Sequence, residues 1–320
     1  MSNQESAQGA PSLMDVHHHM VPPAYLEALK QAGLDTAGFP SWTPQESIEM
    51  MDRLGIEKAS LSISSPGVWF GDDAEARDLA RVCNEYAASV VDSYPRRFDA
   101  LAVLPFPDVE GSVQELAYAM DTLGLAGVIL FSNVGGRYAG DPDFDPLMAE
   151  LHRRGAEVLL HPNTVPEKDE NAPLFPWAEY PIDLARAYAR LVYCDTLVKY
   201  PDIRWILSHA GGVVPFHAER LGKAYYAKDG GLRWGRILKD LALKRHRGLD
   251  LAKGLRYDTV GATNPVTLSS LQSLVGPDRI LFGSNFPWDS EESVGSSISY
   301  RVGAKGRPPG KSSNLNGMGA

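Results

Sequence analysis

The sequence predicts an α/β protein that folds as a (β/α)8 barrel of the TIM type. Eight short β-rich runs alternate with helical runs along 320 residues, as in parallel strands joined by crossover helices. Several runs, such as GVILFS and EVLLH, are continuously apolar, which is expected of strands buried on both faces. A doubly wound sheet would instead carry a glycine-rich phosphate-binding turn after an early strand, and the sequence has none there.

The first predicted strand begins at Leu13, after residues 1–12, which are small or polar and are expected to be disordered. The strand runs into three consecutive histidines, His17, His18 and His19. Because successive side chains of a strand alternate in direction, His17 and His19 point to one side and His18 to the other. Two imidazoles placed in this way can hold one metal ion, since imidazole is the commonest metal-binding side chain.

The remaining elements follow in regular order. Thr43 is predicted to be the N-cap of a helix, because a proline follows it at the first helical position. Gly55 is predicted to end this helix. Further strands are expected at 58–64, 98–105, 127–132, 157–161, 203–209, 255–260 and 279–285. Helices are expected at 24–32, 43–54, 74–94, 111–124, 144–154, 181–200, 213–228 and 264–275.

The chain after the eighth strand looks different. Residues 290–320 are rich in Ser, Gly, Lys and Arg and show no helical period, which is typical of a low-complexity, disordered tail. The barrel is therefore expected to span residues 13–289, with its last helix missing or replaced by this tail.

Composition excludes several classes of protein. The net charge is −9 and no Lys/Arg cluster precedes the last third of the chain, which argues against a nucleic-acid partner. No apolar run approaches the roughly 20 residues of a membrane span, and no signal peptide opens the chain. Cys83 and Cys194 lie far apart in sequence, which fits a reducing, cytoplasmic location.

Four of the eight histidines fall at the ends of predicted strands. His17 and His19 end the first strand, His161 the fifth and His209 the sixth, while Asn285 ends the eighth. In a barrel of this type the carboxyl ends of the strands form one rim, where the active site lies. A single buried histidine is more often structural, but four at one rim predict a metal site there. The other four, His18, His152, His217 and His246, are interpreted as surface or structural.

These motifs resemble the amidohydrolase superfamily. They are DVHHH at 15–19, HP at 161–162, HAGG at 209–212 and GSNFP at 283–287. Within the superfamily they are similar to the branch of metal-dependent non-oxidative decarboxylases, which includes the aminocarboxymuconate-semialdehyde and 6-methylsalicylate types. Segments such as LPFPDV at 104–109 and GRYAGDP at 136–142 resemble the 6-methylsalicylate type.

The resemblance implies that His17, His19 and His161 bind one divalent metal ion, zinc or, as the alternative, manganese. It also implies that His209 is a catalytic histidine that orients the substrate or a metal-bound water. Asn285 takes a position where the family has an aspartate that binds the metal and transfers a proton. An amide is a neutral ligand and cannot transfer a proton near neutral pH. With Asn285 at this position, the chain is therefore expected to be weakly active or inactive.

Loops after the strands supply candidate substrate-binding residues. Trp69, Phe70 and Trp288 could sandwich an aromatic ring, and Arg137 could bind a carboxylate. Ordinary lid packing or a surface ion pair explains each of them equally well.

The function that the resemblance implies is decarboxylation of a small hydroxylated aromatic carboxylic acid, such as a salicylate-type acid, without an organic cofactor. Two alternatives stay open: a metal-dependent hydrolase of a lactone or related ester, and a catalytically impaired family member. The resemblance also implies a possible homodimer.

Overall fold

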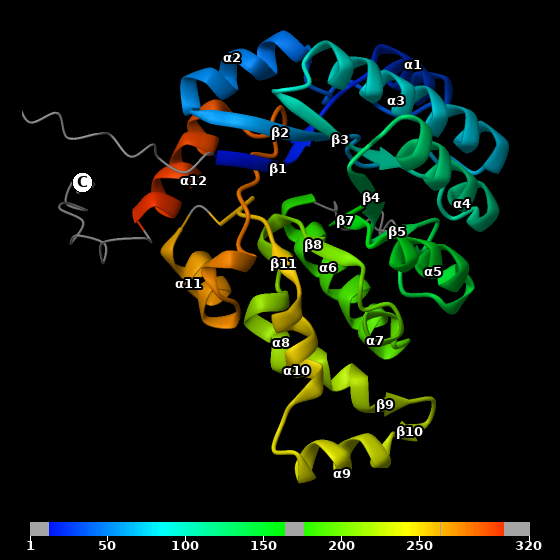
Figure 1. Cartoon of the computed structure of the whole chain (residues 1–320), viewed down its shortest axis with the longest axis vertical. Helices are drawn as coiled ribbons and strands as arrows, with labels where there is room; N and C mark the ends of the chain where they lie inside the picture. The colour runs from blue at the N-terminus through cyan, green and yellow to red at the C-terminus, as the bar shows by residue number, and fades with distance from the viewer. Residues whose placement is uncertain (1–12, 164–175, 263, 304–320) are drawn as a thin grey trace, which may run out of the picture.

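The computed structural model describes residues 13–163, 176–262 and 264–303, and its centre is one curved parallel sheet (Figure 1). The sheet has seven strands, and each is hydrogen-bonded to the next in chain order. They are β1 (Leu13–His19), β2 (Ile56–Ser62), β3 (Phe98–Val103), β4 (Gly127–Phe131), β7 (Glu157–His161), β8 (Arg204–Leu207) and β11 (Arg256–Tyr257).

An eighth strand-like segment closes this sheet into a barrel. Ile280 bridges Tyr257 of β11, and Phe282 bridges Asp15 of β1, both in parallel. The Leu281 N–H donates to the carbonyl of Tyr257 at 2.8 Å, so the segment also hydrogen-bonds to the seventh strand. The predicted barrel is confirmed, and all five residues of β4 are buried, as its continuous apolar run requires.

Helices surround the sheet (Figure 1). The predicted cap of α2 is present: the Thr43 side chain accepts from the Glu46 N–H, and Gly55 ends the helix in the left-handed region at φ 71°. Within the described ranges, no helix combines the length and the apolar character needed to cross a membrane. The principal helices are α1 (Pro23–Gln31), α2 (Pro44–Leu54), α3 (Asp73–Ser93), α4 (Val109–Ala117), α5 (Asp145–Arg154), α6 (Pro176–Tyr193), α7 (Thr196–Lys199), α8 (Val214–Gly222), α10 (Arg247–Gly254) and α11 (Pro265–Leu274).

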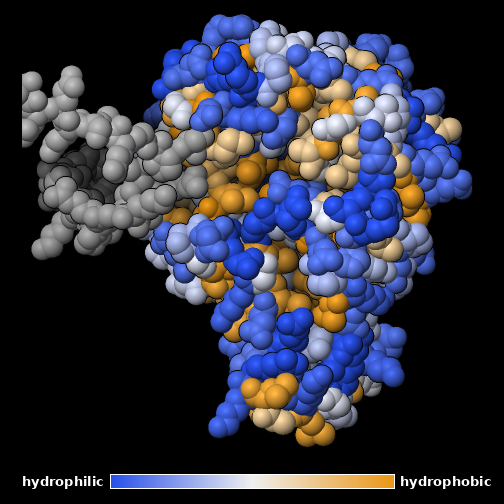
Figure 2. Space-filling model, in the orientation of Figure 1, coloured by the Kyte–Doolittle hydropathy of each residue, from blue (hydrophilic) through white to orange (hydrophobic). Residues whose placement is uncertain are grey.

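An arm projects from the barrel between α8 and α10 (Figure 1). The prediction of one helix over 213–228 is corrected at its end: α8 stops at Gly222, a 3-10 helix, η4 (Lys223–Tyr226), follows, and a short hairpin begins at Ala227. The hairpin pairs β9 (Ala227–Lys228) with β10 (Gly231–Leu232) and leads into α9 (Trp234–Ala242). Apolar side chains gather at the tip of this arm (Figure 2), where Trp234 and Leu238 are more than 60% exposed.

The expectation of a disordered tail from residue 290 is corrected by a helix, α12 (Glu291–Gly303), which follows the eighth strand. Val294 is buried against the core, and the Arg53 guanidinium of α2 pairs with Glu291 at 2.8 Å. The helix escaped prediction because few apolar residues mark its inner face. Residues 1–12 and 304–320, for which disorder was expected, lie outside the described part of the chain.

Candidate metal centre and active site

Three histidines meet at the carboxyl rim of the barrel. His17 and His19 lie at the end of β1, His161 ends β7, and all three are buried. One ring nitrogen of each lies within 4.8 Å of those of the other two. The alternation of β1 sends His18 the other way, where its Nε2 lies 2.8 Å from Ser47 Oγ. The alternation of side chains along β1 therefore places His17 and His19, the two predicted ligands on this strand, on the same side as His161.

Hydrogen bonds orient these three rings. His17 Nδ1–H donates to the Asp258 carboxylate at 2.6 Å, and His161 Nδ1–H donates to the Pro162 carbonyl at 2.7 Å. His19 Nδ1 lies 3.1 Å from Ser62 Oγ and 3.4 Å from the Ser62 carbonyl. Because carboxylates and carbonyls only accept, Nδ1 of His17 and Nδ1 of His161 carry the proton, and the Ser62 carbonyl is an acceptor within reach of His19 Nδ1. The Nε2 atoms face the centre of the cluster.

The three rings fit a metal ion. His17 Nε2 and His19 Nε2 are 2.9 Å apart, and two nitrogen lone pairs at this distance repel each other unless a cation lies between them. A proton could satisfy these two atoms, but it could not also use the third nitrogen, that of His161. A divalent ion can bind all three, which is the common arrangement of catalytic zinc sites.

The electrostatics of the cluster favour the neutral, metal-binding form of imidazole. Burial, followed by the neighbouring imidazoles, holds the pKa of His19 and that of His161 well below the usual range. The pKa of His209 is also lowered well below that range, by burial and then by His17. These rings therefore do not carry a proton on both nitrogens at neutral pH.

His209 lies beside the cluster in the short turn after β8, η3 (His209–Gly211). Its Nε2 is 3.5 Å from His161 Nε2, and its ring centre lies 5.2 Å from that of His17. Its backbone is in the left-handed region at φ 49°, which L residues other than Asn, Asp and His rarely adopt. The turn thus presents this imidazole to the same space as the three converging nitrogens.

Asn285 ends the eighth strand next to His17. Its N–H donates to the His17 carbonyl at 2.9 Å, and its backbone is left-handed at φ 58°. Asparagine tolerates this conformation better than most residues. Its side-chain Nδ2 donates to Asp289 Oδ1 at 3.1 Å. Burial raises the pKa of Asp289, and the hydrogen bond from Asn285 opposes this shift.

Two acids of the site, Asp258 and Asp289, were missed by sequence reasoning. Asp258 is fully buried, and besides His17 it accepts from the N–H groups of Ala210 and Val260 at 3.1 and 3.0 Å. A signal was present, because Asp258 falls in the seventh predicted strand, close to the same rim. Asp289 carried a weaker signal, four residues after the strand that ends at Asn285.

A cavity of about 590 Å³ opens beside the histidines, which suits a ligand with a single aromatic ring. Its walls include His161, His209, Tyr180, Asn285, Trp288 and Asp289.

Of the four predicted substrate-binding residues, only Trp288 is among those that line this cavity in the described structure. The Trp69 indole N–H donates to Asp73, and Arg137 pairs with Asp143 at 2.7 Å and covers the Phe144 ring. Arg137 lies in a small hairpin, β5 (Asn133–Val134) with β6 (Arg137–Tyr138), that follows β4. Phe70 packs against the hydrophobic core. The structure thus gives these three side chains partners elsewhere.

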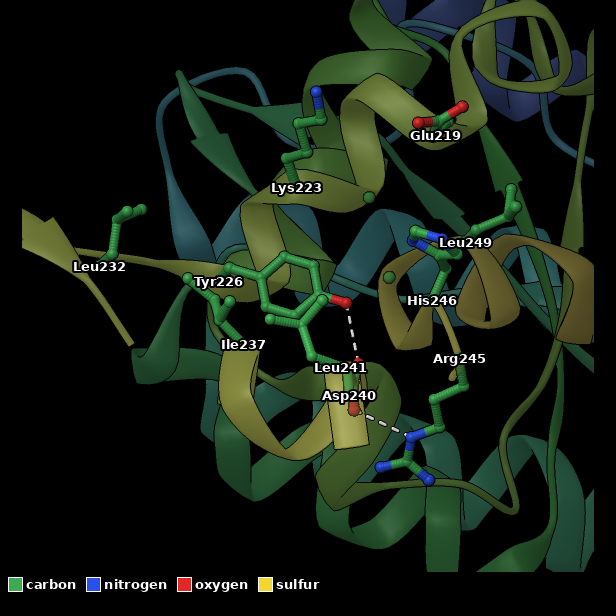
Figure 3. A pocket seen from close by; sticks show the side chains of 12 residues that line it. Glu219, Lys223, Tyr226, Leu232, Ile237, Asp240, Leu241, Arg245, His246 and Leu249 are labelled. Atoms are coloured by element: carbon green, nitrogen blue, oxygen red, sulfur yellow. Dashed lines mark hydrogen bonds and ion pairs between the residues drawn. The ribbon is translucent and has the colours of Figure 1, made fainter. Parts of the chain in front are cut away.

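A second cavity, of about 340 Å³, lies between α8, α10 and the arm. Figure 3 shows that Asp240 is held there by the Tyr226 hydroxyl at 2.8 Å and by Arg245 at 2.9 Å. It shares no lining residue with the histidine cavity. In the described residues, His17, His19 and His161 form the one group of three or more metal-binding side chains. The chemistry is therefore expected at the rim.

Comparisons with known proteins agree with this architecture. The amidohydrolase family model matches residues 14–305. The 6-methylsalicylic acid decarboxylase of Penicillium expansum is 34% identical over 283 residues, which are 86% of this chain and 84% of that protein. The crystal structure of a protein described as amidohydrolase II aligns with a TM-score of 0.79 and 30% identity over 92% of each chain. A dihydroxybenzoic acid decarboxylase from Polaromonas sp. JS666, with bound manganese and 2-nitroresorcinol, shares the fold at a TM-score of 0.71 and 22% identity over 90% of each chain. The chain therefore belongs to the amidohydrolase family.

Proposed function

We propose that the chain is a metal-dependent non-oxidative decarboxylase of a small hydroxylated aromatic carboxylic acid of the salicylate type. The observation that carries this proposal is the meeting of three ring nitrogens, from His17, His19 and His161, next to a cavity that His161 lines and that is sized for one aromatic ring. Support for the substrate class comes from the relative at 34% identity, which decarboxylates 6-methylsalicylic acid by name.

In this proposal His17, His19 and His161 hold one divalent ion, zinc, with manganese as the alternative. When bound, the ion supplies Lewis acidity and a template for the carboxylate and its neighbouring hydroxyl. Manganese has support in the solved relative that contains it. Metal analysis of protein purified without added metal, followed by reconstitution with each ion, separates the two by the activity that each restores.

The residues of the chain perform the rest of the reaction. Trp288 borders the cavity and packs against the substrate ring. The bond between ring and carboxyl carbon breaks, a proton forms the new C–H bond, and CO2 leaves. His209 relays this proton, because an imidazole can accept a proton at one nitrogen and release one from the other, whereas the amide of Asn285 can do neither.

Product analysis tests the proposal. Protein loaded with zinc or manganese is incubated with hydroxylated benzoic acids and, separately, with lactones. CO2 together with the matching phenol supports decarboxylation. Acid formed from a lactone without CO2 would favour the hydrolase, and metal retained without either product would favour a catalytically impaired family member, which Asn285 makes the main competitor.

We further propose that the chain forms a homodimer through the arm at residues 227–247. This segment has seven Lys or Arg against two Asp in a chain whose net charge is −9. Arg233 and Arg236 pair with Asp195 and Arg245 pairs with Asp240, and the other four cations would be attracted by the acidic surface of a second copy. The exposed apolar side chains of the arm would also gain by burial. Light scattering should give a dimer mass that Trp234→Ser with Leu238→Ser reduces to a monomer mass. Val266→Ser, which removes an exposed apolar side chain on α11, is the matched control.

The two cysteines, Cys83 and Cys194, are both unpaired, which supports a proposed location in the reducing cytoplasm. Fractionation of the source cells with an antibody to the chain tests this location.

A further inference from the structure

We infer that Asp289 is a positioning residue that fixes which end of the Asn285 amide faces the metal centre, an inference that rests on the metal-dependent function proposed above. Asn285 Nδ2 donates to Asp289 Oδ1 at 3.1 Å. An amide has one end that donates and one end that accepts, and only its oxygen can bind a cation. A carboxylate can only accept, so Asp289 holds the NH2 end and leaves Oδ1 as the free end.

The backbone prepares this contact. The Asn285 N–H is bound to the His17 carbonyl at 2.9 Å, so the residue is tied to the strand that carries two of the histidines. The Asn285 carbonyl in turn accepts from the N–H groups of Trp288 at 2.9 Å and Asp289 at 3.2 Å. This turn brings residues four apart in sequence to the same side. With the backbone held, the orientation of the Asn285 amide group is the remaining freedom, and Asp289 removes it.

The oxygen of the Asn285 amide is available to bind a cation. In the described part of the chain the Asn285 amide is held at its Nδ2 end by Asp289, and the residue lines the cavity while only 9% exposed. Asn285 and Asp289 both line the cavity that His161 and His209 also line. With its NH2 end held by Asp289, the amide can offer its oxygen to a cation near the histidines.

The pair formed by Asn285 and Asp289 also supplies negative charge to the metal centre. Imidazoles and an amide are neutral ligands, so none of them balances the charge of a divalent ion. Asp289 adds a carboxylate behind the amide, and a charge-assisted hydrogen bond from the NH2 end increases the negative charge on the amide oxygen. In this chain the carboxylate of Asp289, four residues after Asn285, thus acts on the metal centre through the Asn285 amide.

Four variants of the full-length protein test this inference, with manganese affinity measured by competition with a chelator. Asp289→Ala frees the amide and should weaken binding by about tenfold or more, as is typical when the partner of a metal ligand is removed. Asn285→Asp sets two carboxylates against each other at about the 3.1 Å that now separates the amide from Asp289, and should also weaken binding.

The double variant Asn285→Asp with Asp289→Asn restores one carboxylate and one amide in exchanged places and should return the affinity to within about threefold of the parent. Glu292→Ala, which removes an exposed acid nearby, is the control.

Recovery in the double variant would exclude a merely structural role, because a destabilising change at either position would persist there. Parent affinity in Asp289→Ala, or a double variant no better than Asn285→Asp, would overturn the inference. A parent protein that binds manganese but releases no CO2 would refute the proposed decarboxylase and leave the positioning role of Asp289 intact.

Discussion

Replacing Asp258 by asparagine should disable the metal centre by changing the tautomer of one ligand. Asp258 Oδ1 accepts two backbone N–H groups, from Ala210 and Val260, while Oδ2 accepts from His17 Nδ1 at 2.6 Å. In Asp258→Asn the two N–H groups can be satisfied only by the amide oxygen, so the NH2 end must face His17. His17 Nδ1 then has to accept, and the ring proton moves to Nε2, the atom that faces the metal.

The expected magnitude follows from this geometry. Altering the carboxylate behind a ligating histidine typically lowers metal affinity by about 10–100-fold, which is about 1.4–2.7 kcal/mol. We expect the upper end, because both side chains are fully buried and no water can substitute for the lost acceptor. The same kind of substitution in serine proteases, described for their triad aspartate, acts through the wrong histidine tautomer.

Chelator competition and a thermal melt of the apo-protein measure the effect. Asp240→Asn is the matched control, since Asp240 is also a buried, multiply hydrogen-bonded acid but lies in the second cavity. This control should lower stability without changing metal affinity. If Asp258→Asn bound metal as tightly as the parent, the tautomer argument would be refuted.

Three further predictions concern the site and the last helix. His17→Ala with His19→Ala should reduce metal content from one ion per chain to near zero by elemental analysis, and parent content would remove both residues from the centre. His209→Ala should leave metal content nearly unchanged while lowering turnover by about 10²–10⁴-fold, as expected for a proton-transfer group; loss of the metal itself would make His209 a ligand. Val294→Ala should lower the free energy of unfolding by about 1–2 kcal/mol in a denaturant titration, because Val294 is 2% exposed in α12, and an unchanged midpoint would mean that α12 does not pack on the barrel.

The barrel was predictable because its strands are buried on both faces. GVILFS and EVLLH have no polar alternation, and the structure buries β4 throughout and all but the first residue of β7. The eighth strand is present only as two bridges at Ile280 and Phe282, yet its apolar run and its terminal Asn285 were visible in the sequence. The meeting of the histidines then followed from topology, since parallel strands present their carboxyl ends at one rim.

What escaped prediction depends on contacts between distant segments. Asp258 meets His17 across 241 residues, and nothing local marks it as the acceptor for that ring. Arg137 looked available for a substrate carboxylate, but the hairpin that carries it supplies Asp143 as a partner. The helix α12 has few apolar residues, and its packing, through Val294 and the Arg53–Glu291 pair, depends on α2 rather than on its own period.

The most direct test of the proposed metal-dependent decarboxylase is CO2 release as metal is titrated into the apo-protein. With a hydroxylated benzoic acid as substrate, release should be slow, because Asn285 cannot transfer a proton, but it should rise in proportion to metal up to one equivalent per chain and stop when a chelator is added. Release that is unaffected by the chelator, or no release at one bound equivalent, would contradict the claim that His17, His19 and His161 form the metal centre of a decarboxylase.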